Sequence, residues 1–323
     1  MNIGVIVIGR NEGERLRVCI ESVVNVTDRV VYVDSGSADG SVQMVQGMGL
    51  AVVELDMRIP FTAARARNEG VRLLHKLWPS LNYVQFVDGD CELASGWMKT
   101  AAAFLDLNNK VAMVCGRLRE RHPEHSVYNM LCDTEWDTAV GETKACGGNA
   151  MARIEVFDTA GGFRPDLIAG EESELCLRLR ASGWTIWRLD AEMALHDAAM
   201  TRFSQWWKRS MRGGYAYAEG VHLHGASPEK HRVQESRRIW LWGVWIPLAM
   251  TILIGWVGAW GWMMFLIYPI QIIRIALRGS RSVRENWLRA LFLVLGKFPE
   301  AMGQIKFFYN RLSRKTSHLI EYK

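Results

Sequence analysis

Two aspartates separated by a single glycine, in Asp88-Gly89-Asp90, could together hold a divalent cation. They follow the apolar run 83–87, which predicts a strand that ends in a turn. Mg²⁺ or Mn²⁺ in a phosphate-binding site takes one or two protein carboxylates, and phosphate oxygens of the substrate supply further ligands. A sparse acidic turn is therefore sufficient for a metal site, although such a tripeptide alone is more often a solvated loop.

Three further polar segments accompany this tripeptide. VVYVDSGSADGS places Asp34 at a strand end and Asp39 in the next turn, AARARNEG carries Arg65, Arg67 and Asn68, and IAGEESELCLRLR holds Glu171, Glu172 and Glu174. Each also has a simpler interpretation, since Asp34 and Asp39 could only form turns and Arg67 could be a surface charge on a helix. The four segments together are more specific than any one of them.

The elements that must position these residues alternate between strands and helices. The sequence predicts strands at 3–8, 30–33, 51–55, 83–87 and 111–114, and helices at 12–24, 63–77, 94–107 and 171–183. This alternation is typical of an α/β fold with a mostly parallel sheet flanked by helices. Ligands of such sheets bind beyond the carboxyl ends of the strands, where Asp34, Asp88 and Asp90 lie.

The four segments, in this order, resemble those of the family 2 inverting glycosyltransferases of the GT-A fold, over residues 2–220. The resemblance implies a nucleotide-diphospho-sugar transferase that uses a divalent cation, Mg²⁺ or Mn²⁺. It implies that residues 8–12 and Asp34 contact the base and ribose of the donor, while Arg67 reaches the nucleotide. The implied nucleotide-sugar-binding residues are Ile8, Arg10, Glu12, Asp34, Arg67, Asp88 and Gly89, and Asp90 is the implied ligand of the metal that bridges the diphosphate.

The resemblance also places a catalytic base in the acidic segment. A Glu-Asp pair typical of the family is here Glu171-Glu172, and Glu172 aligns with the base that removes the proton of the acceptor hydroxyl. The extra methylene of glutamate shifts the reach of this carboxylate, so Glu171 is the alternative base. A purely structural role, in which these acids stabilise a helix N-terminus, is the simpler interpretation.

Three more segments have a possible role by the same resemblance. His196 could complete the metal site or be structural, and Gly147-Gly148-Asn149 could line the acceptor site or be an ordinary turn. The segment QWWKRSMRGGYAYAEG could bring Arg209 or Arg212 to the diphosphate, or it could lie on anionic lipid as a basic aromatic helix.

The C-terminal part of the chain has the composition of a membrane-bound region. Residues 1–199 carry 20 Lys/Arg against 28 Asp/Glu, whereas residues 200–323 carry 19 against 6. The 35 residues 239–273 contain no charge, have Gly255, Gly258 and Gly261 at their middle, and are flanked by arginines on both sides. A single helix of this length would exceed the ~30 Å hydrocarbon core, so a hairpin with both ends in the cytosol fits better than one span. The alternative is a buried helix pair in a soluble protein.

These patterns predict four regions: a catalytic domain at 1–220, a linker at 221–238, a transmembrane or re-entrant helical hairpin at 239–277, and a basic amphipathic region at 278–323. Scattered cysteines without CxxC pairing argue against a zinc ribbon or a disulfide-stapled secreted fold and place the catalytic part in a reducing cytosol. The basic charge flanks apolar sequence, which favours a membrane over nucleic acid as its partner.

We therefore expect an enzyme at the cytoplasmic face of the inner or plasma membrane. It would transfer a sugar from a UDP- or GDP-linked donor to a lipid-linked or glycan acceptor, with membrane lipid as a further partner. One alternative is a catalytically inactive, membrane-tethered protein that binds nucleotide sugars or acts as a scaffold. Another is nucleotidyl transfer, for which residues 9–13 make a poor phosphate loop.

Overall fold

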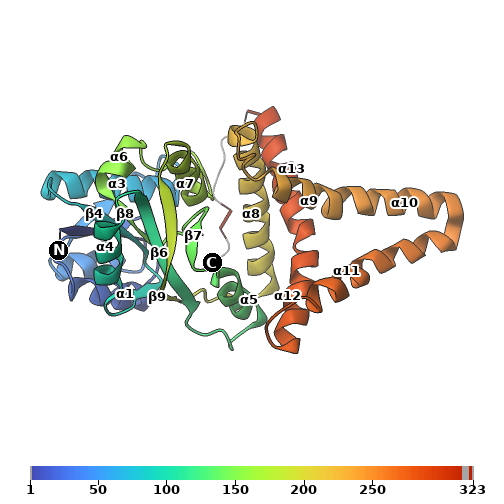
Figure 1. The fold of residues 1–323 in the computed structure, drawn as a ribbon, viewed down its shortest axis with the longest axis horizontal. Helices are drawn as coiled ribbons and strands as arrows, with labels where there is room; N and C mark the ends of the chain where they lie inside the picture. The colour runs from blue at the N-terminus through green and yellow to red at the C-terminus, as the bar shows by residue number, and fades with distance from the viewer. Residues whose placement is uncertain (1, 315–319, 322–323) are drawn as a thin grey trace. The chain divides into compact units, whose positions relative to one another are not determined.

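The protein, described by a computed structural model over residues 2–314 and 320–321, divides into two compact units, Met1–Ala199 and Met200–Lys323 (Figure 1). The strands of the first unit are β1 (Ile3–Gly9), β2 (Val30–Asp34), β3 (Ala51–Glu54), β4 (Tyr83–Asp88), β5 (Cys91–Leu93), β6 (Val111–Glu120), β7 (Gly141–Thr143), β8 (Ala150–Arg153) and β9 (Thr185–His196). Its helices are α1 (Glu14–Val24), α2 (Ser41–Gly47), α3 (Ala63–Leu77), α4 (Trp97–Leu107), α5 (Val127–Trp136), α6 (Ile154–Thr159) and α7 (Glu171–Ala181).

The strands of the first unit that the structure describes form one nine-stranded sheet in the order β3-β2-β1-β4-β8-β6-β9-β5, with β7 paired to β9. Strands β1 to β4 run parallel, whereas β8 is antiparallel to both β4 and β6, and β5 is antiparallel to β9. The predicted α/β sheet with flanking helices is confirmed, and the sheet is mixed where a mostly parallel one was expected. The antiparallel strand β8 is only four residues long and includes Arg153, so the sequence carries no strand signal there.

Apolar side chains hold the parallel half of the sheet together. All five residues of β2 are buried, and β1 is buried from Ile3 to Ile8, as expected for strands with helices on both faces. Helix α3 packs on β1 and β2 through Ala64, Ala66 and Leu74, and Thr62 caps it by accepting a hydrogen bond from the Arg65 amide. The carboxyl ends of β1, β2 and β4 consequently meet at one edge of the sheet.

The second unit is helical. Its helices are α8 (Phe203–His224), α9 (Val233–Trp240), the π-helical turn Leu241–Trp245, α10 (Ile246–Val257), the 3₁₀ segment Gly258–Leu266, α11 (Ile267–Ala276), α12 (Val283–Leu295) and α13 (Lys297–Leu312). The predicted end of the catalytic domain at residue 220 falls inside α8, and the expected linker 221–238 is largely helical, because α8 and α9 both extend into it.

Helices α8 and α13 lie side by side within this unit (Figure 1). Two glycines allow their backbones to approach closely: a Cβ at Gly214 would overlap the Glu300 carbonyl, and a Cβ at Gly303 would overlap the Met211 carbonyl. The side chain of Gln304, fully buried on α13, accepts a hydrogen bond from Ser236 at 2.8 Å. The glycines at the contact therefore allow α8 and α13 to pack closely.

The uncharged segment folds as two helical arms, α10 and α11, that meet at residues 258–266 (Figure 1). The continuous helix Val233–Trp256, 24 residues long, is sufficiently long and apolar to cross a membrane, and Gly261–Ala276 is a shorter apolar helix. Large apolar side chains such as Leu248, Ile252 and Trp256 are exposed on the first arm. The two-armed arrangement agrees with a hairpin, while its insertion into a bilayer stays a prediction.

Candidate active site

Arg67 lies at the centre of a group of three carboxylates. Its guanidinium is 2.8 Å from Asp88 Oδ1, 2.8 Å from Glu171 Oε1 and 3.2 Å from Glu172 Oε1. The side chain is only 2% exposed, so burial works against its charge, but the surrounding carboxylates outweigh burial and raise the pKa of Arg67. Helix α3, strand β4 and helix α7 thus meet at this one arginine, and four of the predicted site residues, Arg67 included, are brought together there.

Gly148 lies against the same group. A Cβ at this position would overlap Arg67 Nη2 and lie 2.8 Å from Asp88 Oδ2 and 3.2 Å from Glu172 Oε1. Only a glycine leaves room for the backbone to pass this close to the charged cluster. The loop at Gly148 therefore borders the carboxylates, and its contact with an acceptor stays a prediction.

The neighbouring Asn149 fixes the acidic turn. Its side chain is 2% exposed, Oδ1 accepts a hydrogen bond from the Asp88 amide at 3.0 Å, and Nδ2 lies 3.3 Å from Cys91 Sγ. The Gly89 amide donates to the Ile8 carbonyl at 2.8 Å, which ties the turn to the end of β1. Strand β8 and its preceding loop thereby hold the turn between β4 and β5 from one side, and β1 holds it from the other.

Glu171 and Glu172 open helix α7, whose N-cap is Gly170 in the left-handed conformation. The Glu171 side chain is 6% exposed and the Glu172 side chain 19% exposed. Burial and the neighbouring Glu171 charge raise the pKa of Glu172 to about 7, and Arg67 offsets only part of this rise. A partly exposed carboxylate that titrates near neutral pH is well matched to proton abstraction.

Asp90 and His196 face each other on the far side of the acidic turn. Asp90 Oδ2 lies 3.3 Å from His196 Nε2, and both residues are mostly buried. Neighbouring ligands of a six-coordinate ion with bonds of ~2.1 Å are about 3.0 Å apart, so this pair fits a divalent cation with little adjustment. Cys91 lies in the same group, and burial raises the pKa of its thiol well above the usual value.

The sheet order explains how His196 reaches this position. It ends β9, which lies between β5 and β6, and it is in register with Cys91 on one side and Glu120 on the other. Glu120 Oε2 is 3.6 Å from His196 Nδ1, and the Trp136 ring meets the imidazole edge-on with centroids 4.7 Å apart. Glu120 and Trp136 were not predicted as site residues. The apolar run of β6 ends at residue 114, before Arg117 and Arg119, so Glu120 was not recognised as part of a strand.

The residues expected at the base and ribose lie at the ends of β1 and β2. Both carboxylate oxygens of Asp34 accept hydrogen bonds within its own turn, Oδ1 from Tyr32 and Oδ2 from the amides of Gly36 and Ser37. Arg10 stacks over the Phe61 ring at 4.7 Å, and Glu12 pairs with Arg15 at 2.7 Å. The structure thus gives Asp34 a turn-forming role, and its contact with a nucleotide stays a prediction.

The remaining predicted site residues, Arg209 and Arg212, are on α8 in the second unit. Their assignment to the diphosphate or to lipid stays a prediction.

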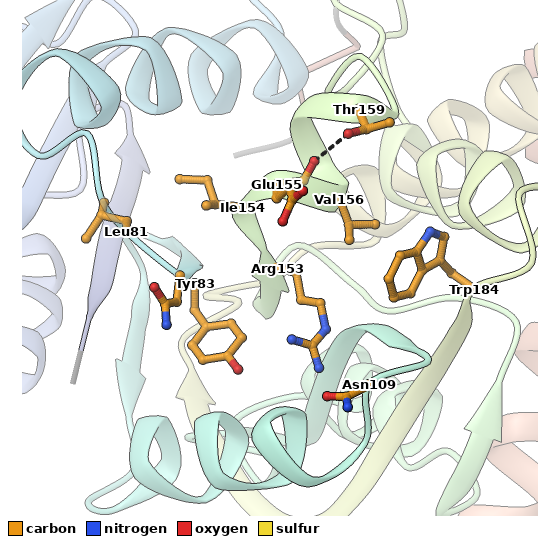
Figure 2. A pocket seen from close by; sticks show the side chains of 10 residues that line it. Leu81, Tyr83, Asn109, Arg153, Ile154, Glu155, Val156, Thr159 and Trp184 are labelled. Carbon is orange, nitrogen blue, oxygen red and sulfur yellow. Dashed lines mark hydrogen bonds between the residues drawn. The ribbon is translucent and has the colours of Figure 1, made fainter.

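A cavity of about 500 Å³ lies elsewhere in the first unit (Figure 2). Its wall includes Tyr83 at the start of β4, Arg153 at the end of β8, and Trp184 just before β9. Figure 2 shows the Arg153 guanidinium between the Tyr83 ring and Asn109. Because β4 and β9 begin here, the cavity lies at the amino ends of these strands, opposite the acidic turn. None of its lining residues belongs to the predicted site.

Comparisons with known proteins agree with the α/β fold of the chain. Residues 4–158 match the family model described as Glycosyl transferase family 2. Among solved structures, the chain is similar to the mannosyltransferase PcManGT from Pyrobaculum calidifontis, in complex with GDP-Man and Mn²⁺, at 18% identity and a TM-score of 0.59, covering 96% of this chain and 88% of that one. It is also similar to S. aureus TarS 1–349, at 14% identity and a TM-score of 0.49, covering 96% and 92%. A search of curated proteins finds no match to this chain.

Proposed function

We propose that the protein, whose residues 4–158 match the model of glycosyl transferase family 2, is a glycosyltransferase that transfers a sugar from a UDP- or GDP-linked donor to a lipid-linked or glycan acceptor, with inversion, at the cytoplasmic face of a membrane. The observation that carries this proposal is the group formed by Arg67, Asp88, Glu171 and Glu172 at the carboxyl ends of the strands, bordered by Gly148. In α/β sheets of this kind, ligands bind beyond the carboxyl ends of the strands.

The donor would lie against the acidic turn. Asp88 is 32% exposed and is held by Arg67, so its second oxygen is available to a ribose hydroxyl. Asp90 and His196 would hold a divalent cation, which supplies charge stabilisation to the departing diphosphate. Mn²⁺ suits this pair better than Mg²⁺ because it accepts an imidazole ligand, and the similar mannosyltransferase PcManGT was solved with GDP-Man and Mn²⁺.

The acceptor hydroxyl would give its proton to Glu172. Its carboxylate is more exposed than that of Glu171, it borders Gly148, and its pKa is close to neutral. Glu171 is more deeply buried, and its Oε1 lies closer to the Arg67 guanidinium than that of Glu172. These differences favour Glu172 as the base and Glu171 as the residue that holds Arg67 in place.

A membrane acceptor is supported by the second unit. The uncharged arms expose Leu248, Ile252 and Trp256, and arginines lie at both ends of the segment. Exposed apolar area of this extent marks an interaction surface, and the flanking charge suits the cytoplasmic face of a bilayer. Helices α12 and α13 carry Arg289, Lys306 and Arg311 among apolar residues, as expected of helices in a membrane interface.

The direct test offers the purified full-length protein a panel of nucleotide sugars with Mn²⁺ or Mg²⁺, with and without a lipid extract, and measures nucleotide release. We expect release from one donor class that increases when lipid is added. Binding of a donor without any release would instead favour the inactive scaffold.

A further inference from the structure

The environment of His196 assigns a role to Glu120, a buried carboxylate on β6. We propose that Glu120 is a positioning residue that holds the Nδ1–H of His196 and so directs its Nε2 lone pair toward the cation at Asp90. The inference deepens the proposed function and rests on its metal site. It concerns two residues in register across β6 and β9, the last residue of each strand.

Glu120 is firmly fixed. Its side chain is fully buried; Oε1 accepts hydrogen bonds from Asn129 Nδ2 at 3.1 Å and from the His122 amide at 3.3 Å, and Oε2 accepts one from the Ala198 amide at 3.1 Å. These three N–H donors fix the position of the carboxylate, with Oε2 on the side of the imidazole.

The two ring nitrogens of His196 face different carboxylates. Nε2 faces Asp90 Oδ2 at 3.3 Å, and Nδ1 faces Glu120 Oε2 at 3.6 Å. Nδ1 is buried and, among the residues that the structure describes, has no partner within hydrogen-bond distance. Glu120 is the acceptor that a small rotation of the ring would bring within reach. The edge of Trp136 restricts the ring to that neighbourhood.

The tautomer follows from this geometry. A neutral histidine carries one proton, and only the nitrogen without it can bind a metal. If Glu120 accepts a hydrogen bond from the protonated Nδ1, Nε2 carries no proton. Nε2 is then the atom that can bind the metal, on the side of Asp90. Metal-ligating histidines commonly donate their other N–H to a carboxylate, and loss of that partner typically weakens metal affinity 10- to 100-fold.

The test measures Mn²⁺ affinity of the full-length protein by electron paramagnetic resonance of free Mn²⁺, without donor. Glu120→Gln should weaken binding about 10- to 100-fold. Glu92→Gln is the matched control: Glu92 lies on β5 in register with Leu195 and pairs with Arg121, so its substitution removes the same charge nearby and should leave affinity close to that of the wild type.

A second readout needs no variant. With diamagnetic Zn²⁺ bound to wild-type protein, ¹⁵N spectra of histidine should show His196 protonated at Nδ1 and coordinated at Nε2. Protonation at Nε2, or affinity in folded Glu120→Gln equal to that of Glu92→Gln, would overturn the inference. If Asp90→Ala and His196→Ala also retained Mn²⁺ affinity, the metal site of the proposed function would fail instead; if those two lost it and Glu120→Gln did not, only the role of Glu120 would be refuted.

Discussion

Glu172 is the side chain whose surroundings most clearly separate a catalytic role from a structural one. A carboxylate that only caps a helix would lose little when made neutral, about 0.3–1 kcal/mol of stability. A general base contributes typically 10²- to 10⁴-fold to the rate. Glu172→Gln should therefore leave nucleotide binding intact and slow transfer by that factor. The measurement is kcat alongside donor affinity, with Glu171→Gln in parallel; a larger loss of kcat in Glu171→Gln would move the base by one residue.

The raised pKa of Glu172 predicts a pH-dependent stability. Its pKa is about 7 in the folded protein, above the ordinary value of 4.5 for a glutamate, so the folded state binds the proton more tightly than the unfolded state. The stabilisation is fully present below pH ~4.5 and is lost as pH rises through ~7. Compared with the wild type, Glu172→Gln should gain thermal stability between pH 5 and 8, without metal or donor. A difference in melting temperature that is independent of pH would contradict this.

Among the elements, two adjacent glycines of α8, Gly213 and Gly214, provide a matched test of how the second unit packs. A Cβ at Gly214 would overlap the Glu300 carbonyl of α13, whereas a Cβ at the adjacent Gly213 meets nothing within 4 Å. Alanine within a helix is normally more stable than glycine by about 1 kcal/mol. Gly213→Ala should therefore maintain or raise the unfolding temperature, and Gly214→Ala should lower it. Equal effects of the two substitutions would contradict the close contact of α8 and α13.

The elements also show where the sequence was informative. Helix 63–77 was predicted with its observed bounds, and four of the predicted strands match observed ones to within a residue or two, because each is a mostly apolar run. Strand β6 was predicted to end at residue 114 but runs to Glu120. Arg117 and Arg119 interrupt its apolar pattern, and their partners, Asp133 and Glu192, are distant in sequence. Long-range charge pairing of this kind is invisible to local periodicity.

The site residues, like the strands, were predicted only in part. Asp88, Arg67, Gly148, Glu171 and Glu172 were chosen by resemblance, and the structure brings them together. Helix α5 and the end of β6, which carry Trp136 and Glu120, were not predicted. Their relation to His196 depends on the register of β6 with β9, which a single sequence does not reveal.

At the scale of the whole molecule, the apolar arms predict that the chain is retained on membranes. Deletion of residues 237–323 removes both arms and the helices that follow, so the remaining protein should appear in the soluble fraction. The measurement is membrane pelleting followed by immunoblotting. Full-length Asp90→Ala is the control and should still pellet, since its change lies in the first unit. Continued pelleting of the truncated chain would contradict the membrane assignment.

The central claim is that this protein transfers a sugar by chemistry that depends on a cation at Asp90. The most direct measurement is Mn²⁺-dependent nucleotide release from the preferred donor, compared between the wild type and Asp90→Ala. We expect the wild type to release nucleotide, whereas Asp90→Ala should bind nucleotide more weakly in Mn²⁺ and release none above background. Full activity in Asp90→Ala would contradict it.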